Sequence, residues 1–173
     1  MGLLCLLYFA AVTGAYGITM WLPQIIKGFG NLSSFQVGIL SAIPFAAAAI
    51  AMVPVGRSSD RRGERRWHLA LSAFASAIGF VISAWAQNPV VALAAISLGA
   101  MGTTAALEPF WAMPASFLSG AAAAGGIALI NSVGNLGGFI GPYAVGLLRQ
   151  TTHSFSAGLI GLAAALALAG VSG

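Results

Sequence analysis

The sequence predicts an all-α membrane protein with six transmembrane helices, and two observations carry this prediction. Only 6% of the 173 residues are charged and 59% are hydrophobic, and the mean hydropathy is +0.94. Soluble domains carry roughly 25% charged residues, so a soluble fold of this length could not cover its surface with so few. The apolar residues also divide into about six runs, each near the ~20 residues that a helix needs to cross a bilayer.

Proline, glycine and capping residues set the expected helix boundaries. The first helix is expected to stop at Pro23, and Ser33 with Gln36 has the capping-box spacing that begins the second. Asn88 before Pro89 is typical of the start of a helix. The fifth apolar run is too long for one straight span, and Pro142 predicts a bent or partly broken helix there. We expect one transmembrane domain over residues 1–173, with helices at about 3–22, 34–56, 68–86, 89–112, 121–148 and 155–173.

The charge of the chain is concentrated between the second and third expected helices. Five of the seven Lys and Arg residues, and two of the three acidic residues, lie within residues 57–67. Because positively charged loops stay on the cytoplasmic side, this stretch is predicted to be a cytoplasmic loop. Both termini are then cytoplasmic, and Lys27 and Arg149 lie at the opposite surface. A topology signal explains the charge better than a groove for phosphates, so nucleic-acid binding is not expected.

The residues of this basic loop also have an ordered spacing. Glycines permit a tight turn, Asp60 can accept hydrogen bonds from the amides of a helix N-terminus, and Arg57 lies at a helix C-terminus, where a cation is favoured. The alternation of Asp and Arg allows an ion-pair network. Two interpretations stay open: the loop only marks topology, or Arg57, Asp60, Arg61 and Arg65 form a latch that stabilises one conformation.

The fifth expected helix carries two amides in an apolar setting. Asn131 and Asn135 are four residues apart and share a helix face. Amides in a membrane helix either bond to neighbouring helices or line a wet cavity, and both interpretations stay open. Tyr16, which lies deeper in the first helix than Trp21, is a candidate to line the same cavity. The alternative for these aromatic residues is a belt at the membrane surface.

Glu108 is the only acidic residue outside the basic loop. A carboxylate in a membrane helix is a candidate for proton coupling. Its place beside Pro109, near the expected inner end of a helix, equally fits a hydrated helix terminus. The sequence has no catalytic triad, paired catalytic carboxylates, phosphate loop or metal-spaced His/Cys cluster. We therefore expect neither an enzyme nor a bound cofactor or metal.

The second and fifth expected helices resemble each other. One begins Gly-Ile-Leu-Ser at 38–41 and carries Pro54 before its end, and the other begins Gly-Ile-Ala-Leu at 126–129 and carries Pro142. Each is the second helix of a set of three, and the two run in opposite directions. Inverted repeats of three plus three helices are a signature of transporters.

Four segments together resemble the C-terminal half of the major facilitator superfamily, in the form found in its anion:cation symporter family. The bacterial tartrate, hexuronate and phthalate transporters are the nearest likeness. The resemblance covers essentially the whole chain. It is carried by residues 16–27, 57–68, 109–114 and 126–138.

The resemblance implies one six-helix half of a transporter with 3+3 inverted repeats. Such a protein moves small organic carboxylates by alternating access, using a proton or sodium gradient in place of a cofactor. It implies that Tyr16, Asn131 and Asn135 face the central path, and that Asp60 docks on the opposite half. Glu108 stands where the family has a neutral residue, so it inherits no role.

The same resemblance implies the partners and the location. The expected partners are the lipid bilayer, an N-terminal six-helix half that this chain does not contain, and a small organic anion. The expected location is a bacterial inner membrane. Other interpretations stay open: an inactive truncated or split-gene fragment, a half-transporter that pairs with itself, and a non-transport scaffold or assembly subunit.

Overall fold

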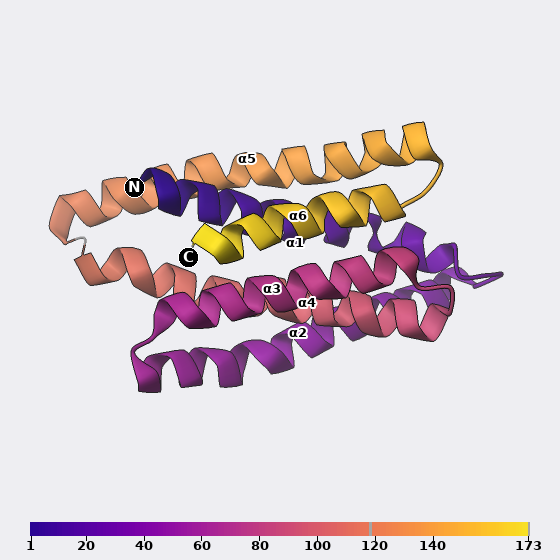
Figure 1. Ribbon diagram of the computed structural model, residues 1–173, viewed down its shortest axis with the longest axis horizontal. Coiled ribbons are helices and arrows are strands. Elements are labelled where there is room, and N and C mark those ends of the chain that lie inside the picture. The colour runs from indigo at the N-terminus through magenta and orange to yellow at the C-terminus, as the bar shows by residue number, and fades with distance from the viewer. Residues whose placement is uncertain (118, 173) are drawn as a thin grey trace.

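The computed structural model describes residues 1–117 and 119–172, and these residues form a bundle of six α-helices (Figure 1). Five of the helices are long and apolar enough to cross a membrane, and α6 is a shorter apolar helix. The all-helical fold class predicted from composition is therefore confirmed. The helices are α1 (Gly2–Lys27), α2 (Ser34–Arg62), α3 (Arg65–Trp85), α4 (Pro89–Phe117), α5 (Gly120–Thr152) and α6 (Ser156–Ser172).

The expected basic loop over 57–67 is wrong in extent, because most of it is helical. Helix α2 continues to Arg62, and α3 begins at Arg65, so the connection is only two residues long. Gly63 ends α2 in the left-handed conformation, with φ of 67°, and its amide donates to the Ser59 carbonyl at 2.9 Å. Arginines in the last turn of a helix interact favourably with its C-terminal dipole, which explains why the helix extends this far.

Prolines do not end the helices where the sequence suggested. Helix α1 passes through Pro23 to Lys27, and α4 passes through Pro109 and Pro114 to Phe117. Helix α5 is continuous for 33 residues through Pro142, not broken there. A proline removes one intrahelical hydrogen bond, but tertiary packing compensates. In α1, Ile25 and Ile26 lie beyond the proline and are buried in the core.

The helices pack as two triplets in space that differ from the triplets in sequence. Helices α1, α5 and α6 contact one another, and so do α2, α3 and α4 (Figure 1). Helix α1 therefore packs with α5 and α6, and α4 packs with α2 and α3. The first helix of each sequence triplet thus joins the second and third helices of the other triplet. Exchanging α1 with α4, α2 with α5 and α3 with α6 maps one spatial triplet onto the other. This arrangement is the 3+3 repeat that the sequence suggested.

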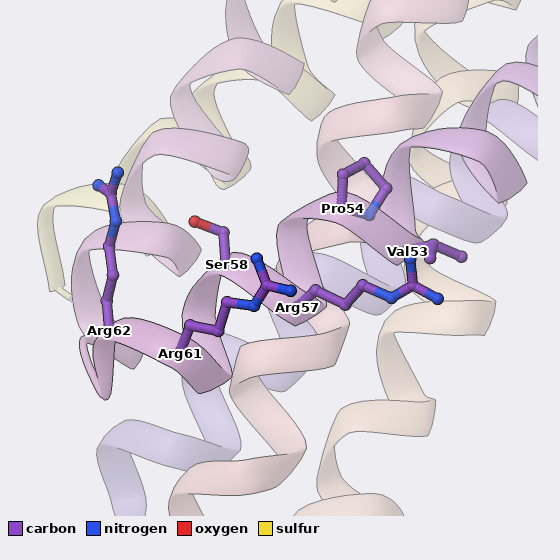
Figure 2. A pocket seen from close by; sticks show the side chains of 6 residues that line it. All are labelled: Val53, Pro54, Arg57, Ser58, Arg61 and Arg62. Carbon is purple, nitrogen blue, oxygen red and sulfur yellow. The ribbon is translucent and has the colours of Figure 1, made fainter.

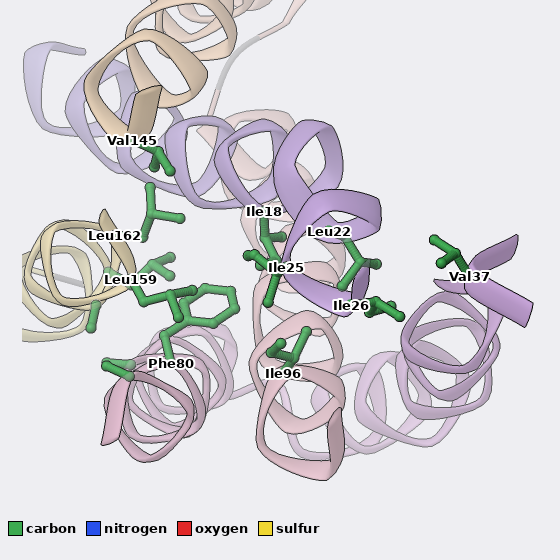
Figure 3. Close-up of a cluster of buried hydrophobic side chains, with 14 residues drawn as sticks. Ile18, Leu22, Ile25, Ile26, Val37, Phe80, Ile96, Val145, Leu159 and Leu162 are labelled. Carbon is green, nitrogen blue, oxygen red and sulfur yellow. The ribbon is translucent and has the colours of Figure 1, made fainter. Parts of the chain in front are cut away.

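One apolar core joins all six helices (Figure 3). Its largest fully buried side chains include Phe80 of α3, Leu22 of α1, Ile96 of α4 and Leu166 of α6. Close helix contact beside this core depends on small residues. A Cβ on Gly79 of α3 would lie 2.5 Å from the Gly99 amide nitrogen of α4. Such small residues allow backbones in a membrane bundle to approach closely.

The chain alternates between the two ends of the bundle. Both termini lie at one end, together with the α2–α3 and α4–α5 connections, and the other three connections lie at the opposite end (Figure 1). The five clustered arginines are therefore at the same end as the termini. Lys27 and Arg149, at the C-terminal ends of α1 and α5, lie at the other end.

We expect Gly79→Ala to destabilise the bundle. Its Cβ would meet the Gly99 nitrogen at 2.5 Å and the Ala95 carbonyl oxygen at 2.6 Å, and backbone atoms cannot turn aside. Overpacking of this kind costs about 1–3 kcal/mol. The effect is measured as the melting temperature of the detergent-solubilised protein, which is the temperature at which its monodisperse size-exclusion peak is half lost. Gly38→Ala is the control, because nothing lies within 4 Å of the added Cβ. Equal melting of the two variants would contradict the packing argument.

Candidate functional site

The bundle has one face on which two helices are little covered. In α2 and α5, only 17% and 22% of the most apolar 18-residue stretch is buried, against 50–56% of the equivalent stretch in α1, α3 and α4. The two helices are equivalents under the 3+3 repeat. Helix α2 packs mainly on α4 and α5 mainly on α1, with α1 against α4 between them. We call the surface that follows the order α2, α4, α1, α5 the open face.

Asn131 and Asn135 lie together on α5 and are both exposed. The Asn135 Nδ2 donates to the Asn131 Oδ1 at 2.8 Å, which confirms that they share a helix face. Among the residues that the structure describes, neither amide bonds to another helix. The pair therefore presents its remaining donors and acceptors outward and does not hold described helices together.

Tyr16 comes from α1 and borders the same part of α5. Its ring lies against Gly138, where an added Cβ would be 3.5 Å from the Tyr16 Cγ. Gly138 follows Asn135 by three residues, so Tyr16 contacts α5 about one helical turn away from Asn135. Gly14 and Gly17 of α1 face Leu166 and Leu162 of α6. Tyr16 thus projects away from α6 and is 48% exposed.

An aromatic cluster that sequence reasoning missed borders the Asn pair. The Tyr8 ring stacks on Phe110 at 5.3 Å between centroids and meets Trp111 edge-on at 4.8 Å. Tyr8 also contacts Gly134, which lies between the two asparagines in α5. The signal was present in the sequence, because Phe110 and Trp111 belong to a segment that carried the family resemblance. Only the fold brings Tyr8 to them.

Glu108 is exposed on α4, nine residues before the end of that helix, and it faces α2. A Cβ on Gly56 would lie 3.8 Å from the Glu108 Cβ. The α2–α4 contact is the repeat counterpart of the α1–α5 contact where Tyr16 lies against Gly138. Glu108 is therefore an exposed carboxylate at the contact between α4 and α2.

The arginines of the expected latch lie on the last two turns of α2 and at the start of α3. Arg57 and Arg61, one turn apart, extend along the same side of α2, whereas Arg62 points elsewhere (Figure 2). With Val53, Pro54 and Ser58, the three arginines line an open depression of about 390 Å³. This depression carries concentrated positive charge and is suited to an acidic partner or an anionic headgroup.

The latch residues differ in what they contact. The Arg65 guanidinium donates through Nη1 to the Ala112 carbonyl of α4. His68 links α3 to α2 through its Nε2, which is 3.0 Å from the Ser58 Oγ. Within the described residues, Asp60 is exposed and forms no ion pair with Arg57, Arg61 or Arg65. The structure thus joins α2, α3 and α4 here by hydrogen bonds, and Asp60 points to the outside of the bundle.

Comparison with known proteins identifies relatives along the whole chain. Residues 4–172 match the family model of the Major Facilitator Superfamily. The chain is 44% identical over 168 residues to a protein named putative tartrate transporter from Agrobacterium vitis, covering 97% of this chain and 37% of that protein. A quinolone resistance transporter from Acinetobacter baumannii is 44% identical over 157 residues, with 91% and 36% covered.

A third relative is the inner membrane transport protein RhmT of Escherichia coli (strain K12). It is 36% identical over 162 residues, which cover 93% of this chain and 38% of RhmT. The chain therefore spans less than two fifths of the length of each of these relatives.

Ser76→Ala is expected to destabilise the bundle more than Asn135→Ala, because Ser76 bonds a neighbouring helix and Asn135 bonds only within its own helix. The Ser76 Oγ of α3 is buried and bonds the Gly99 carbonyl at 2.7 Å and the Thr103 hydroxyl at 2.6 Å, both of α4. Its loss should cost about 1 kcal/mol, near the range measured for membrane helices. Asn135→Ala should change stability by less than about 0.5 kcal/mol. Equal loss in the two variants, measured by chemical unfolding in detergent, would show that Asn135 is structural.

Arg65→Gln should lower stability more than Arg57→Gln, although both remove one positive charge. Arg65 bonds the Ala112 carbonyl, whereas Arg57 has no hydrogen bond or ion pair within the described residues. A hydrogen bond from a charged donor contributes about 1.5–3 kcal/mol. Hydrogen exchange at the ends of α3 and α4 provides the measurement. Faster exchange in Arg57→Gln than in Arg65→Gln would contradict the assignment.

Proposed function

Because the chain belongs to the Major Facilitator Superfamily, we propose that it forms the C-terminal six-helix half of a transporter for small organic anions. The observation that carries this proposal is the open face, where Asn131, Asn135 and Tyr16 present polar groups from helices that are otherwise apolar. Two relatives are named putative tartrate transporter, which supports a carboxylate substrate.

The proposed transport path runs between this open face and a second six-helix half. Helices α2 and α5 are the least covered of the five long helices, as expected for helices that meet another surface in the membrane. Transporters of this kind hold substrate near the bilayer midplane, where two sets of helices meet. Asn131 and Asn135 would donate to a substrate oxygen, and Tyr16 and the Tyr8 cluster would form the adjoining wall.

The proposed orientation places the arginine-rich end in the cytoplasm of a bacterium. Five arginines lie at that end, against Lys27 and Arg149 at the other, and the positive-inside rule favours this choice. Both termini are then cytoplasmic, and the depression lined by Arg57, Arg61 and Arg62 faces the inner leaflet. In this proposal, Asp60 is free to dock on the other half, which completes the latch.

We propose that transport is coupled to a proton gradient. Glu108 is the only acidic side chain outside the basic stretch, and it is exposed beside Gly56 of α2. Protonation would remove its charge and ease the sliding of α4 past α2 during alternating access. A sodium gradient is the alternative coupling, and it is distinguished by the same experiment.

The experiment is uptake of labelled tartrate into proteoliposomes that contain this chain with a matching N-terminal half. An inward proton gradient should accelerate uptake, a protonophore should abolish the acceleration, and sodium alone should have no effect. A quinolone is included as a competitor, because one relative is named for quinolone resistance. No gradient-dependent uptake of tartrate or of any related carboxylate would refute the proposal.

Asn131→Ala and Asn135→Ala should each lower the rate of tartrate uptake about tenfold, since a lost hydrogen bond worth about 1.4 kcal/mol corresponds to that factor. Asn31→Ala is the matched control, because Asn31 is exposed in the α1–α2 connection, away from the open face. Uptake that falls equally in all three variants would contradict a direct role of the α5 pair.

A further inference from the structure

Arg149 is held in a fixed position at the end of the bundle opposite the arginine-rich stretch. Its Nη1 donates to the Gln24 Oε1 of α1 at 2.6 Å. Its guanidinium lies 4.5 Å from the ring centroid of Phe155 and 5.5 Å from that of Trp21. The Trp21 indole is itself fixed by a 2.9 Å hydrogen bond to the Pro142 carbonyl. A single cation is thus oriented by residues from α1, α5 and the α5–α6 connection.

The guanidinium keeps donors that these contacts do not use. Arginine has five N–H donors, and only the bond to Gln24 is made within the described residues. No acidic side chain in the described part of the chain forms an ion pair with Arg149. Arg149 is only partly buried, and the edge of its planar group is the part that binds a carboxylate in bidentate geometry.

Two carbonyls in the last turns of α5 accept hydrogen bonds from side-chain hydroxyls. The Thr151 hydroxyl donates to the Leu147 and Leu148 carbonyls, both at 3.1 Å. The Thr152 hydroxyl donates to the Leu148 carbonyl at 2.6 Å. These hydroxyl donors partly offset the negative potential of the Leu147 and Leu148 carbonyls, so that the positive charge of Arg149 is the main local charge.

The oriented arginine borders a depression of about 390 Å³. Its volume is within the range of small-ligand pockets. Gln150 and His153 add an amide and an imidazole to the guanidinium. His153 caps α5 in the left-handed conformation, with φ of 54°. The lining residues are Trp21, Gly146, Arg149, Gln150 and His153.

We propose that this depression is an oxyanion-binding site at the outer end of the transporter, where a carboxylate of the incoming organic anion binds before it enters the central path. This inference rests on the proposed function and deepens it by adding an entry site. Arg149 binds the carboxylate in bidentate fashion, and Gln150 and His153 donate to the remaining oxygens. A lipid phosphate has similar charge and acceptors, so the experiment separates the two sources.

The test uses the four tryptophans of the chain as reporters. The chain is labelled with 5-fluorotryptophan and placed in nanodiscs of zwitterionic lipid, and Trp21→Phe assigns the Trp21 resonance in the ¹⁹F NMR spectrum. Tartrate should shift the Trp21 resonance to saturation, while the resonance of Trp67, near the opposite end of α3, stays in place. No saturable shift of Trp21 would overturn the proposal.

Matched variants locate the site. Arg149→Gln should weaken tartrate binding at least tenfold, and Arg149→Lys should weaken it less, because a lysine keeps the charge without the bidentate geometry. Lys27→Gln removes the same charge from the same end of the bundle but does not border the depression, so binding should be unchanged. Four resolved tryptophan resonances in each variant show that it is folded. Equal affinity of Arg149→Gln and the unaltered chain would overturn the proposal.

Nanodiscs with anionic phosphatidylglycerol distinguish the source of the oxyanion. Tartrate should still shift the Trp21 resonance in these discs. A Trp21 shift caused by phosphatidylglycerol alone, with no further effect of tartrate, would assign the site to a lipid headgroup and overturn the proposal.

Transport kinetics separate this inference from the proposed function. In the reconstituted transporter, Arg149→Gln should raise the KM for tartrate and leave kcat unchanged. Tartrate uptake with unaltered KM in Arg149→Gln would refute the entry site alone. Absence of uptake by the unaltered protein would instead refute the proposed function.

Discussion

The close approach of helix backbones at small residues is the constraint on which the rest of this structure depends. Lipid tails are as apolar as leucine, so membrane helices gain little by hiding apolar side chains from them and associate through tight packing. Gly137 of α5 lies so near α1 that a Cβ would be 2.6 Å from the Thr13 Oγ1. Gly79, Gly99 and Gly102 allow an equally close approach between α3 and α4. These two contacts place α1 and α4 at the centre of the bundle.

The open face follows from that packing. With α1 and α4 at the centre and α3 and α6 packed against them, α2 and α5 each have one covered side. Polar side chains in a membrane helix cannot face lipid at low cost. The exposed pair of Asn131 and Asn135 therefore marks this face as one that meets water or another protein surface. The site depends on the glycine contacts because they leave this surface uncovered.

Much of the fold and part of the candidate site could be predicted from the sequence. Apolar runs determine helices in a bilayer, and the four-residue spacing of Asn131 and Asn135 determines a shared face. Helix ends were harder to predict. Residues 57–62 looked like a loop because they are charged, but charge decides only where a helix leaves the lipid and not where it ends. Gly63, with its positive φ, ends α2.

The sequence by itself determined the membrane environment, the number of helices, and the end of the bundle at which the positive charge is concentrated. These properties depend on composition and on local periodicity. Only the tertiary structure decided that Tyr8 joins Phe110 and Trp111, and that Arg149 meets Gln24, Trp21 and Phe155. The physical reason is that these contacts join helices distant in sequence. Their register depends on how glycines in one helix fit the side chains and backbone of another.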